Sequence, residues 1–143
     1  MILLISTCID TLSENEFVFP VADIIKEGCL IKHYTKLTEE LIKKSSKIII
    51  CGTSLKDNCY LDKLNRFSWI NNHPNPILGI CSGMQIIALV YGAKLTKKKE
   101  IGQIKVKTLI KNPLFSGEFD AYSLHSNNVS SLKEFNILAR SDR

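Results

Sequence analysis

The segment from Gly79 to Gln85, which reads Gly-Ile-Cys-Ser-Gly-Met-Gln, constrains the fold of this 143-residue chain more than any other feature. The apolar run at residues 76–78 comes directly before it, and an apolar helical stretch follows. When a strand turns abruptly into a helix, the residues two before and two after the turning residue almost touch, so neither can carry a Cβ atom. Gly79 and Gly83 meet this requirement around Cys81. The pattern therefore predicts a nucleophile elbow, in which Cys81 sits at a sharp bend between a strand and a helix.

Cys81 is the candidate nucleophile at this bend. The turn lifts its side chain off the end of the strand and points the first free N–H groups of the helix at it. Because a helix N-terminus favours negative charge, we expect its thiol to ionise more easily than an ordinary cysteine. A buried, inert cysteine beside two turn glycines is the alternative interpretation of the same residues.

Strand and helix signals alternate along the chain as far as Tyr91. The run at 47–51, which is apolar after Lys47 and mostly β-branched, is typical of a central parallel strand covered on both faces. Thr38 is placed to cap a helix. The alternation predicts a parallel sheet with right-handed crossovers. The helix expected at 83–91 is apolar on all sides, which predicts burial in the middle of the domain. We expect strands at residues 1–5, 29–33, 47–51 and 77–80, and helices after Pro20, after Thr38, around 61–67 and at 83–91.

The pattern changes beyond Lys94. Apolar or β-branched residues alternate with lysines from 104 to 108, which predicts an antiparallel hairpin added to the sheet, with one face in water. Further short strands are expected at 121–124 and 135–139. A chain of this length without repeats has room for one core, so we expect a single domain over residues 1–143.

Composition and charge argue against several functions. The net charge of +5 is modest, and the dense basic run Lys97-Lys98-Lys99 lacks the interleaved aromatic residues of a nucleic-acid site, so we expect it at a solvated hairpin tip. The five cysteines show no C-x-x-C pair and no histidine at metal-ligand spacing, which argues against a disulfide framework or a metal site. No stretch approaches membrane-spanning length. We expect a cytoplasmic protein without a metal ion or cofactor, and without nucleic-acid or membrane partners.

Four segments, in order, resemble class I, triad-type glutamine amidotransferases. Residues 79–93 resemble the nucleophile segment, and residues 47–54 resemble the strand and glycine loop that supply part of the oxyanion hole. Glu100-Ile101-Gly102 resembles the family's Glu-x-Gly hairpin, and residues 123–129 resemble its His-Ser segment near the substrate. The resemblance implies a three-layer, flavodoxin-like α/β fold with a mostly parallel central sheet.

The resemblance also implies a reaction and a set of site residues. The Cys81 thiolate would attack the side-chain amide of glutamine and release ammonia for a synthetase partner. The family's usual Gly-Gly-Pro loop reads Cys51-Gly52-Thr53 here, and the backbone N–H groups of Gly52 and Ser82 would form the oxyanion hole. The residues expected to bind the substrate are Thr53, Gln85, Ser126 and Asn127.

The family's catalytic base and orienting acid, a His and a Glu from one late His-x-Glu segment, have no counterpart in this sequence. The last residues resemble the strand before that segment, so we expect a truncated form of a longer protein, with little activity from these 143 residues alone. His73 belongs at the wrong end of the sheet, because chemistry gathers at the carboxyl ends of parallel strands. His33 lies at the correct end and stays open as a base, whereas the family counterpart of His125 is not the triad base.

Within the family, the Glu-x-Gly and His-Ser-x-x-Val segments are more similar to the glutaminase subunit of archaeal-type GMP synthase than to the anthranilate or carbamoyl-phosphate branches. Two alternatives stay open. One is a non-catalytic amidotransferase-like protein that binds or regulates a synthetase. The other is a different cysteine hydrolase on the same superfold. Gln85 argues against the hydrolase, since a clamp for the glutamine backbone is of little use to a peptidase.

Overall fold

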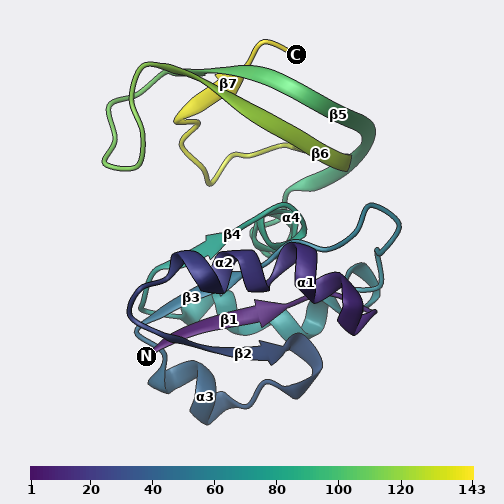
Figure 1. Ribbon diagram of the computed structural model, residues 1–143, viewed down its shortest axis with the longest axis vertical. Helices are drawn as coiled ribbons and strands as arrows, with labels where there is room; N and C mark the ends of the chain where they lie inside the picture. Colours follow the sequence, from purple (N-terminus) through teal and green to yellow (C-terminus); the bar gives the residue numbers. More distant parts are fainter. The chain divides into compact units, whose positions relative to one another are not determined.

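The computed structural model describes residues 1–143, which divide into two compact units, Met1–Gly92 and Ala93–Arg143 (Figure 1). The expectation of a single domain over the whole chain stays a prediction. None of the helices in either unit is long and apolar enough to cross a bilayer.

The first unit is built around a sheet of four strands in the order β2-β1-β3-β4 (Figure 1). Each pair of neighbouring strands is parallel, which confirms the predicted sheet. Its strands are β1 (Ile2–Ser6), β2 (Cys29–His33), β3 (Lys47–Ile50) and β4 (Ile77–Gly79). Its helices are η1 (Thr11–Ser13), α1 (Glu14–Phe17), α2 (Phe19–Ile24), η2 (Tyr34–Lys36), α3 (Glu39–Lys44), η3 (Leu61–Asn72) and α4 (Ser82–Val90), where η marks a 3-10 helix.

Helices cover both faces of this sheet, as expected for a three-layer α/β fold. Leu4 of β1 packs in one cluster with Val18, which joins α1 to α2. Ile5 of β1 packs in the other cluster, together with Phe67 of η3 and Ile86 of α4. Successive side chains of a strand point to opposite faces, so β1 supplies both cores from alternate residues.

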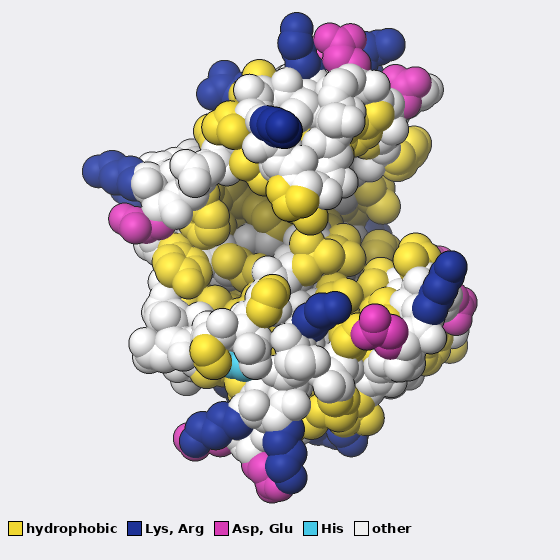
Figure 2. Space-filling model, turned by 90° about the vertical axis from the view of Figure 1, so that its left-hand side faces the viewer, with side chains coloured by type: hydrophobic (Ala, Val, Ile, Leu, Met, Phe, Trp, Pro, Cys, Tyr) yellow, Lys and Arg dark blue, Asp and Glu magenta, His cyan; other side chains and the backbone are white.

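The short helix α3 begins where its sequence indicates. The Thr38 hydroxyl accepts a hydrogen bond from the Leu41 N–H at 3.3 Å, which confirms the predicted cap. Two lysine–glutamate pairs at i,i+4 spacing lie on the solvent side of the helix. These charges gather over α3 at the lower end of Figure 2. Exposed pairs of this kind contribute little to stability, so the packing of Ile42 in the core holds this helix in place.

Two helices differ from the prediction. The helix expected around 61–67 is a 3-10 helix that runs to Asn72, and it is kinked at Lys63, whose φ of −125° and ψ of 24° are not helical. The prediction that the helix after Cys81 is buried on all sides is wrong, since Met84 is 42% exposed. Only one side of α4 packs against β3, β4 and η3, and that side includes the buried Gln85.

The second unit is an antiparallel sheet of three strands in the order β6-β5-β7. The predicted hairpin is confirmed, but it forms a sheet of its own and does not extend the parallel sheet. The strand expected at 121–124 is part of the longer β6. The strand expected at 135–139 lies instead at 139–141, because its pairing with residues 106–108 of β5 fixes its position. The strands are β5 (Lys94–Thr108), β6 (Glu118–Ser130) and β7 (Ala139–Ser141).

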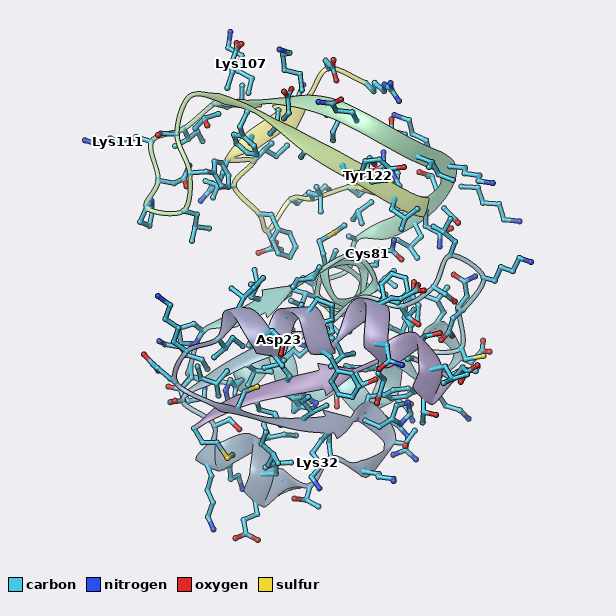
Figure 3. All side chains as sticks on the ribbon, in the orientation of Figure 1. Asp23, Lys32, Cys81, Lys107, Lys111 and Tyr122 are labelled. Atoms are coloured by element: carbon cyan, nitrogen blue, oxygen red, sulfur yellow. The ribbon has the colours of Figure 1, made fainter.

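The alternation in β5 places its lysines on the solvent face. Lys105 lies 3.9 Å from Asp120, and Lys107 lies 3.6 Å from Glu118, in cross-strand ion pairs. Lys107 points away from the sheet in Figure 3. The lysine run at 97–99 is exposed as expected, but it lies at an irregularity in the β5–β6 register and not at the hairpin tip.

Candidate active site

Cys81 lies between β4 and α4 in a strained backbone conformation (Figure 3). Its φ of 51° and ψ of −110° are outside the regions normally open to residues with a Cβ atom. Strain of this kind costs about 1–3 kcal/mol, and it persists where surrounding contacts hold it, often at functional sites. The sharp bend predicted from the sequence is therefore present.

The two glycines of the bend are required for different reasons. A Cβ atom on Gly79 would lie 2.5 Å from the Met84 amide nitrogen and 2.6 Å from the Gly83 carbonyl carbon, as the predicted close approach demands. A Cβ atom on Gly83 would instead collide with the carbonyl group of Ile50 in β3. The first glycine thus permits the bend itself, and the second lets α4 lie directly against the neighbouring strand.

The loop that follows β3 lies beside Cys81. A Cβ atom on Gly52 would be 3.3 Å from the Cβ atom of Cys81. The Gly52 N–H has no acceptor in the structure, and the Ser82 N–H donates a hydrogen bond to the Cys81 sulfur. The structure therefore brings Gly52 and Ser82 next to Cys81, and their role as oxyanion donors stays a prediction.

The thiol of Cys81 does not ionise easily in this structure, contrary to our expectation. Burial raises the pKa of the Cys81 thiol above its ordinary value, and the hydrogen bond from the Ser82 N–H lowers it by less. The physical reason is that the side chain has lost hydration at the foot of α4, and one N–H group does not replace it.

Thr53 and Gln85, two of the expected substrate-binding residues, are buried and already hold protein partners. The Thr53 hydroxyl donates a hydrogen bond to Oδ2 of Asp57 at 2.8 Å. The Tyr60 hydroxyl donates to Oε1 of Gln85 at 2.5 Å. Both side chains therefore fix the loop between β3 and η3, and their contact with a substrate stays a prediction.

Sequence reasoning missed three residues that organise this end of the sheet: Thr7, Asp57 and Tyr60. Asp57 also accepts a hydrogen bond from the Ile9 N–H at 2.6 Å, so it joins the loop after β3 to the loop after β1. Thr7 contacts Cys51 and Ser82. A polar Lys-Asp-Asn turn was the only available signal for Asp57. Thr7 and Tyr60 have partners far along the chain, which no local pattern reveals.

The remaining expected substrate residues, Ser126 and Asn127, lie on β6 of the second unit, where Asn127 is paired with Lys97. Their contact with a substrate stays a prediction. In the same unit, Nε2 of His125 lies 3.5 Å from a carboxylate oxygen of Glu100. The predicted His-Ser and Glu-x-Gly segments thus meet across the β5–β6 pairing.

The two histidines of the first unit are poorly placed to serve Cys81. His33 is the last residue of β2, and its Nδ1 lies 2.6 Å from the Thr35 hydroxyl. Because β1 and β3 separate β2 from β4, about 14 Å of sheet lies between the strand ends. Proton transfer needs hydrogen-bond contact, directly or through one water, so the strand order argues against His33 as a base. His73 precedes β4 and lies at the opposite end of the strand from Cys81, as predicted.

Comparison with known proteins identifies the family. The family model described as glutamine amidotransferase class-I matches residues 24–143. The chain belongs to this family. The resemblance of the chain to class I glutamine amidotransferases is thereby confirmed.

Curated relatives of this amidotransferase chain include subunits of glutamine-hydrolysing GMP synthases from archaea. The chain is 38% identical to the subunit from Thermoplasma acidophilum over 100 residues, which cover 66% of this chain and 50% of the relative. It is 46% identical to the subunit from Methanosphaera stadtmanae over 125 residues, which cover 82% of this chain and 64% of the relative. The matches thus span half to two thirds of the length of these relatives.

Solved structures support the amidotransferase fold. A putative GMP synthase subunit from Thermoplasma acidophilum superposes with a TM-score of 0.79 at 24% identity, covering 99% of this chain and 74% of that one. A glutamine amidotransferase from Thermotoga maritima gives a TM-score of 0.75 at 19% identity, covering 99% and 67%. These likenesses and the parallel sheet confirm the predicted α/β fold class.

Proposed function

We propose that this amidotransferase chain carries the nucleophile of a glutaminase, and that Cys81 is that nucleophile. The Cys81 sulfur attacks the side-chain amide carbon of glutamine, and the amide oxygen becomes an oxyanion that the Gly52 and Ser82 N–H groups stabilise. The C–N bond then breaks, the nitrogen takes the proton that the Cys81 thiol has lost and leaves as ammonia, and a γ-glutamyl thioester remains on Cys81. Water cleaves the thioester, frees glutamate and restores the thiol.

The strained backbone at Cys81 is the observation that carries this proposal. A buried cysteine with a packing role has no need of a positive φ. Here two glycines that leave no room for a Cβ atom hold the bend. The bend brings the Cys81 side chain beside Gly52, whose N–H has no acceptor.

We further propose that the ammonia passes to a synthetase partner, and that this partner is the synthetase of a GMP synthase. The support is the similarity of this chain to two relatives that are subunits of that enzyme. The five free cysteines suit a reducing compartment, which supports a cytoplasmic location.

An electrophilic glutamine analogue, 6-diazo-5-oxo-norleucine, tests the nucleophile. We expect peptide mapping by mass spectrometry to find the label on Cys81, and the Cys81→Ser variant to remain unlabelled. Iodoacetamide is the matched control reagent, because it should also modify the exposed Cys59. Analogue found on Cys59 or Cys8 in place of Cys81 would defeat the assignment.

A non-catalytic binding protein is the second candidate, and one observation favours it. Burial raises the pKa of the Cys81 thiol, which disfavours the thiolate that a nucleophile needs. Such a protein would bind glutamine, measured by calorimetry, without forming a covalent product on Cys81. Covalent labelling by the analogue separates the two candidates.

A further inference from the structure

Two buried hydroxyl groups, those of Thr7 and Ser82, contact the carbonyl oxygen of Cys51. The Thr7 hydroxyl donates to this oxygen at 3.1 Å, and the Ser82 hydroxyl lies 3.2 Å from it. The two hydroxyl oxygens are also 2.9 Å apart. Thr7 and Ser82 are 1% and 2% exposed, so water does not compete for these contacts.

The cluster lies where the direction of the sheet reverses. Thr7 follows β1 and Cys51 follows β3, the two central strands from which the chain continues to opposite edges. Open α/β sheets bind their ligands outside the carboxyl ends of the strands at this point. The hydroxyl groups therefore support the part of the sheet at which a ligand is expected.

The Cys51 carbonyl and the Gly52 N–H belong to one peptide group. That group is planar and trans, so its C=O and N–H point in opposite directions. Two hydroxyl groups that hold the carbonyl oxygen inside the sheet therefore fix the direction of the Gly52 N–H. That N–H is buried and has no acceptor, which is rare for a backbone donor and indicates that a ligand atom takes this position.

We infer that Thr7 is a positioning residue for the oxyanion hole of the Cys81 site. Its hydroxyl orients the Gly52 N–H through the Cys51 carbonyl, and it contacts Ser82, whose own N–H is the second donor. One side chain thus sets the two donors relative to each other. The inference rests on the proposed glutaminase function and deepens it, because Thr7 itself touches neither the substrate nor Cys81.

The geometry also explains why loss of the Thr7 hydroxyl should not unfold the protein. A carbonyl oxygen has two lone pairs, and in a Thr7→Val variant the Ser82 hydroxyl still donates to the Cys51 oxygen. Valine fills the volume of threonine without its hydroxyl group. The variant therefore loosens the peptide group at Gly52 and leaves the core of the sheet packed.

Glutamate γ-semialdehyde is the probe for the test. The Cys81 S–H adds across its C=O bond, so that a C–S bond forms, the π bond breaks and the proton moves to oxygen. This oxygen occupies the oxyanion position. The affinity of the semialdehyde therefore reports how well the two N–H donors are placed. The dissociation constant is obtained from protection of Cys81 against iodoacetamide, with glutamate as the matched ligand that forms no such bond. Part of the aldehyde cyclises in solution, and this lowers the free aldehyde concentration equally for every variant.

For Thr7→Val we expect the dissociation constant of the semialdehyde to rise about tenfold, less than the full loss of one oxyanion donor. The constant for glutamate and the unprotected alkylation rate should stay as in the wild type. Thr7→Ser should restore tight binding. Ser45→Ala is the control, since Ser45 carries an equally buried hydroxyl that bonds the Leu41 carbonyl in α3.

Equal affinity of the semialdehyde for Thr7→Val and wild type would overturn the inference, as would a parallel loss for semialdehyde and glutamate. Should Thr7→Val fail to fold in thermal unfolding, Ser82→Ala removes the other hydroxyl of the cluster and gives the same comparison. If the wild type gains no protection from the semialdehyde, the proposed nucleophile itself is wrong, which is a different failure from that of Thr7.

Discussion

The Tyr60 hydroxyl donates a hydrogen bond to Oε1 of Gln85 over 2.5 Å, and both side chains are almost fully buried. Tyr60 ends the loop after β3, and Gln85 lies in the first turns of α4. The contact therefore ties the glycine loop to the helix that carries Cys81 at its start. It also explains how a polar glutamine can face the core.

Tyr60→Phe should lower the free energy of unfolding by about 1–3 kcal/mol, because the Gln85 oxygen loses the hydrogen bond from the buried Tyr60 hydroxyl. Urea denaturation measures this change. Tyr122→Phe is the matched control, since the Tyr122 side chain is 69% exposed and should change stability by less than about 0.5 kcal/mol. Equal effects of the two variants would contradict a structural role for the Tyr60 contact.

Gly83→Ala should destabilise the protein by about 3 kcal/mol, the upper end for an overpacked core. In an exposed helix this change would add about 1 kcal/mol of stability, so the expected sign comes from the collision with Ile50 alone. Gly92→Ala is the comparison, because Gly92 has a φ of +81° with nothing near its missing Cβ atom. We expect it to cost about 1–2 kcal/mol. A neutral or stabilising Gly83→Ala would show that α4 can move away from β3.

Gly52→Ala should slow the alkylation of Cys81 and should have only a small effect on the free energy of unfolding. The added methyl group would lie 3.3 Å from the Cys81 Cβ atom, closer than ordinary packing, so it presses on the side chain that reacts. The rate of alkylation by iodoacetamide, followed by mass spectrometry, measures the effect, and modification of Cys59 in the same sample is the internal control. An unchanged Cys81 rate would mean that the loop yields to the methyl group.

The stability of the first unit should fall at alkaline pH because of Cys51. Burial raises the pKa of the Cys51 thiol to about 12. Its contribution is fully present below the unfolded-state pKa of about 8.5 and is lost as pH rises toward 12, because the unfolded chain ionises first. At about 1.4 kcal/mol per pH unit, the loss reaches about 2–3 kcal/mol by about pH 10.5.

A Cys51→Ala variant isolates this effect. Guanidinium denaturation between about pH 7.5 and about pH 10.5 should show a shallower decline for the variant than for the wild type. Cys59→Ala, which changes an exposed side chain, should keep the wild-type decline. Parallel curves for Cys51→Ala and the wild type would show that the Cys51 thiol does not control the alkaline loss.

The features that the sequence predicted depend on neighbours in the chain. The bend at Cys81 follows from glycines two residues away on each side, and the cap of α3 follows from Thr38 at its first turn. The features that it missed depend on contacts between distant residues. Thr7 contacts Ser82, 75 residues further along the chain. The position of β7 in the sequence is set by its pairing with β5. The exposure of Met84 was missed because apolar composition does not say which side of α4 has a partner.

The close contact between Gly83 and the Ile50 carbonyl group bears on when, during synthesis, Cys81 reaches its native conformation. The kink at Cys81 is held against an adjacent strand, so a nascent chain whose β3 and β4 have not yet paired carries only an ordinary flexible cysteine. Time-resolved alkylation of residue 81 would then act as a clock for the docking of that edge of the sheet.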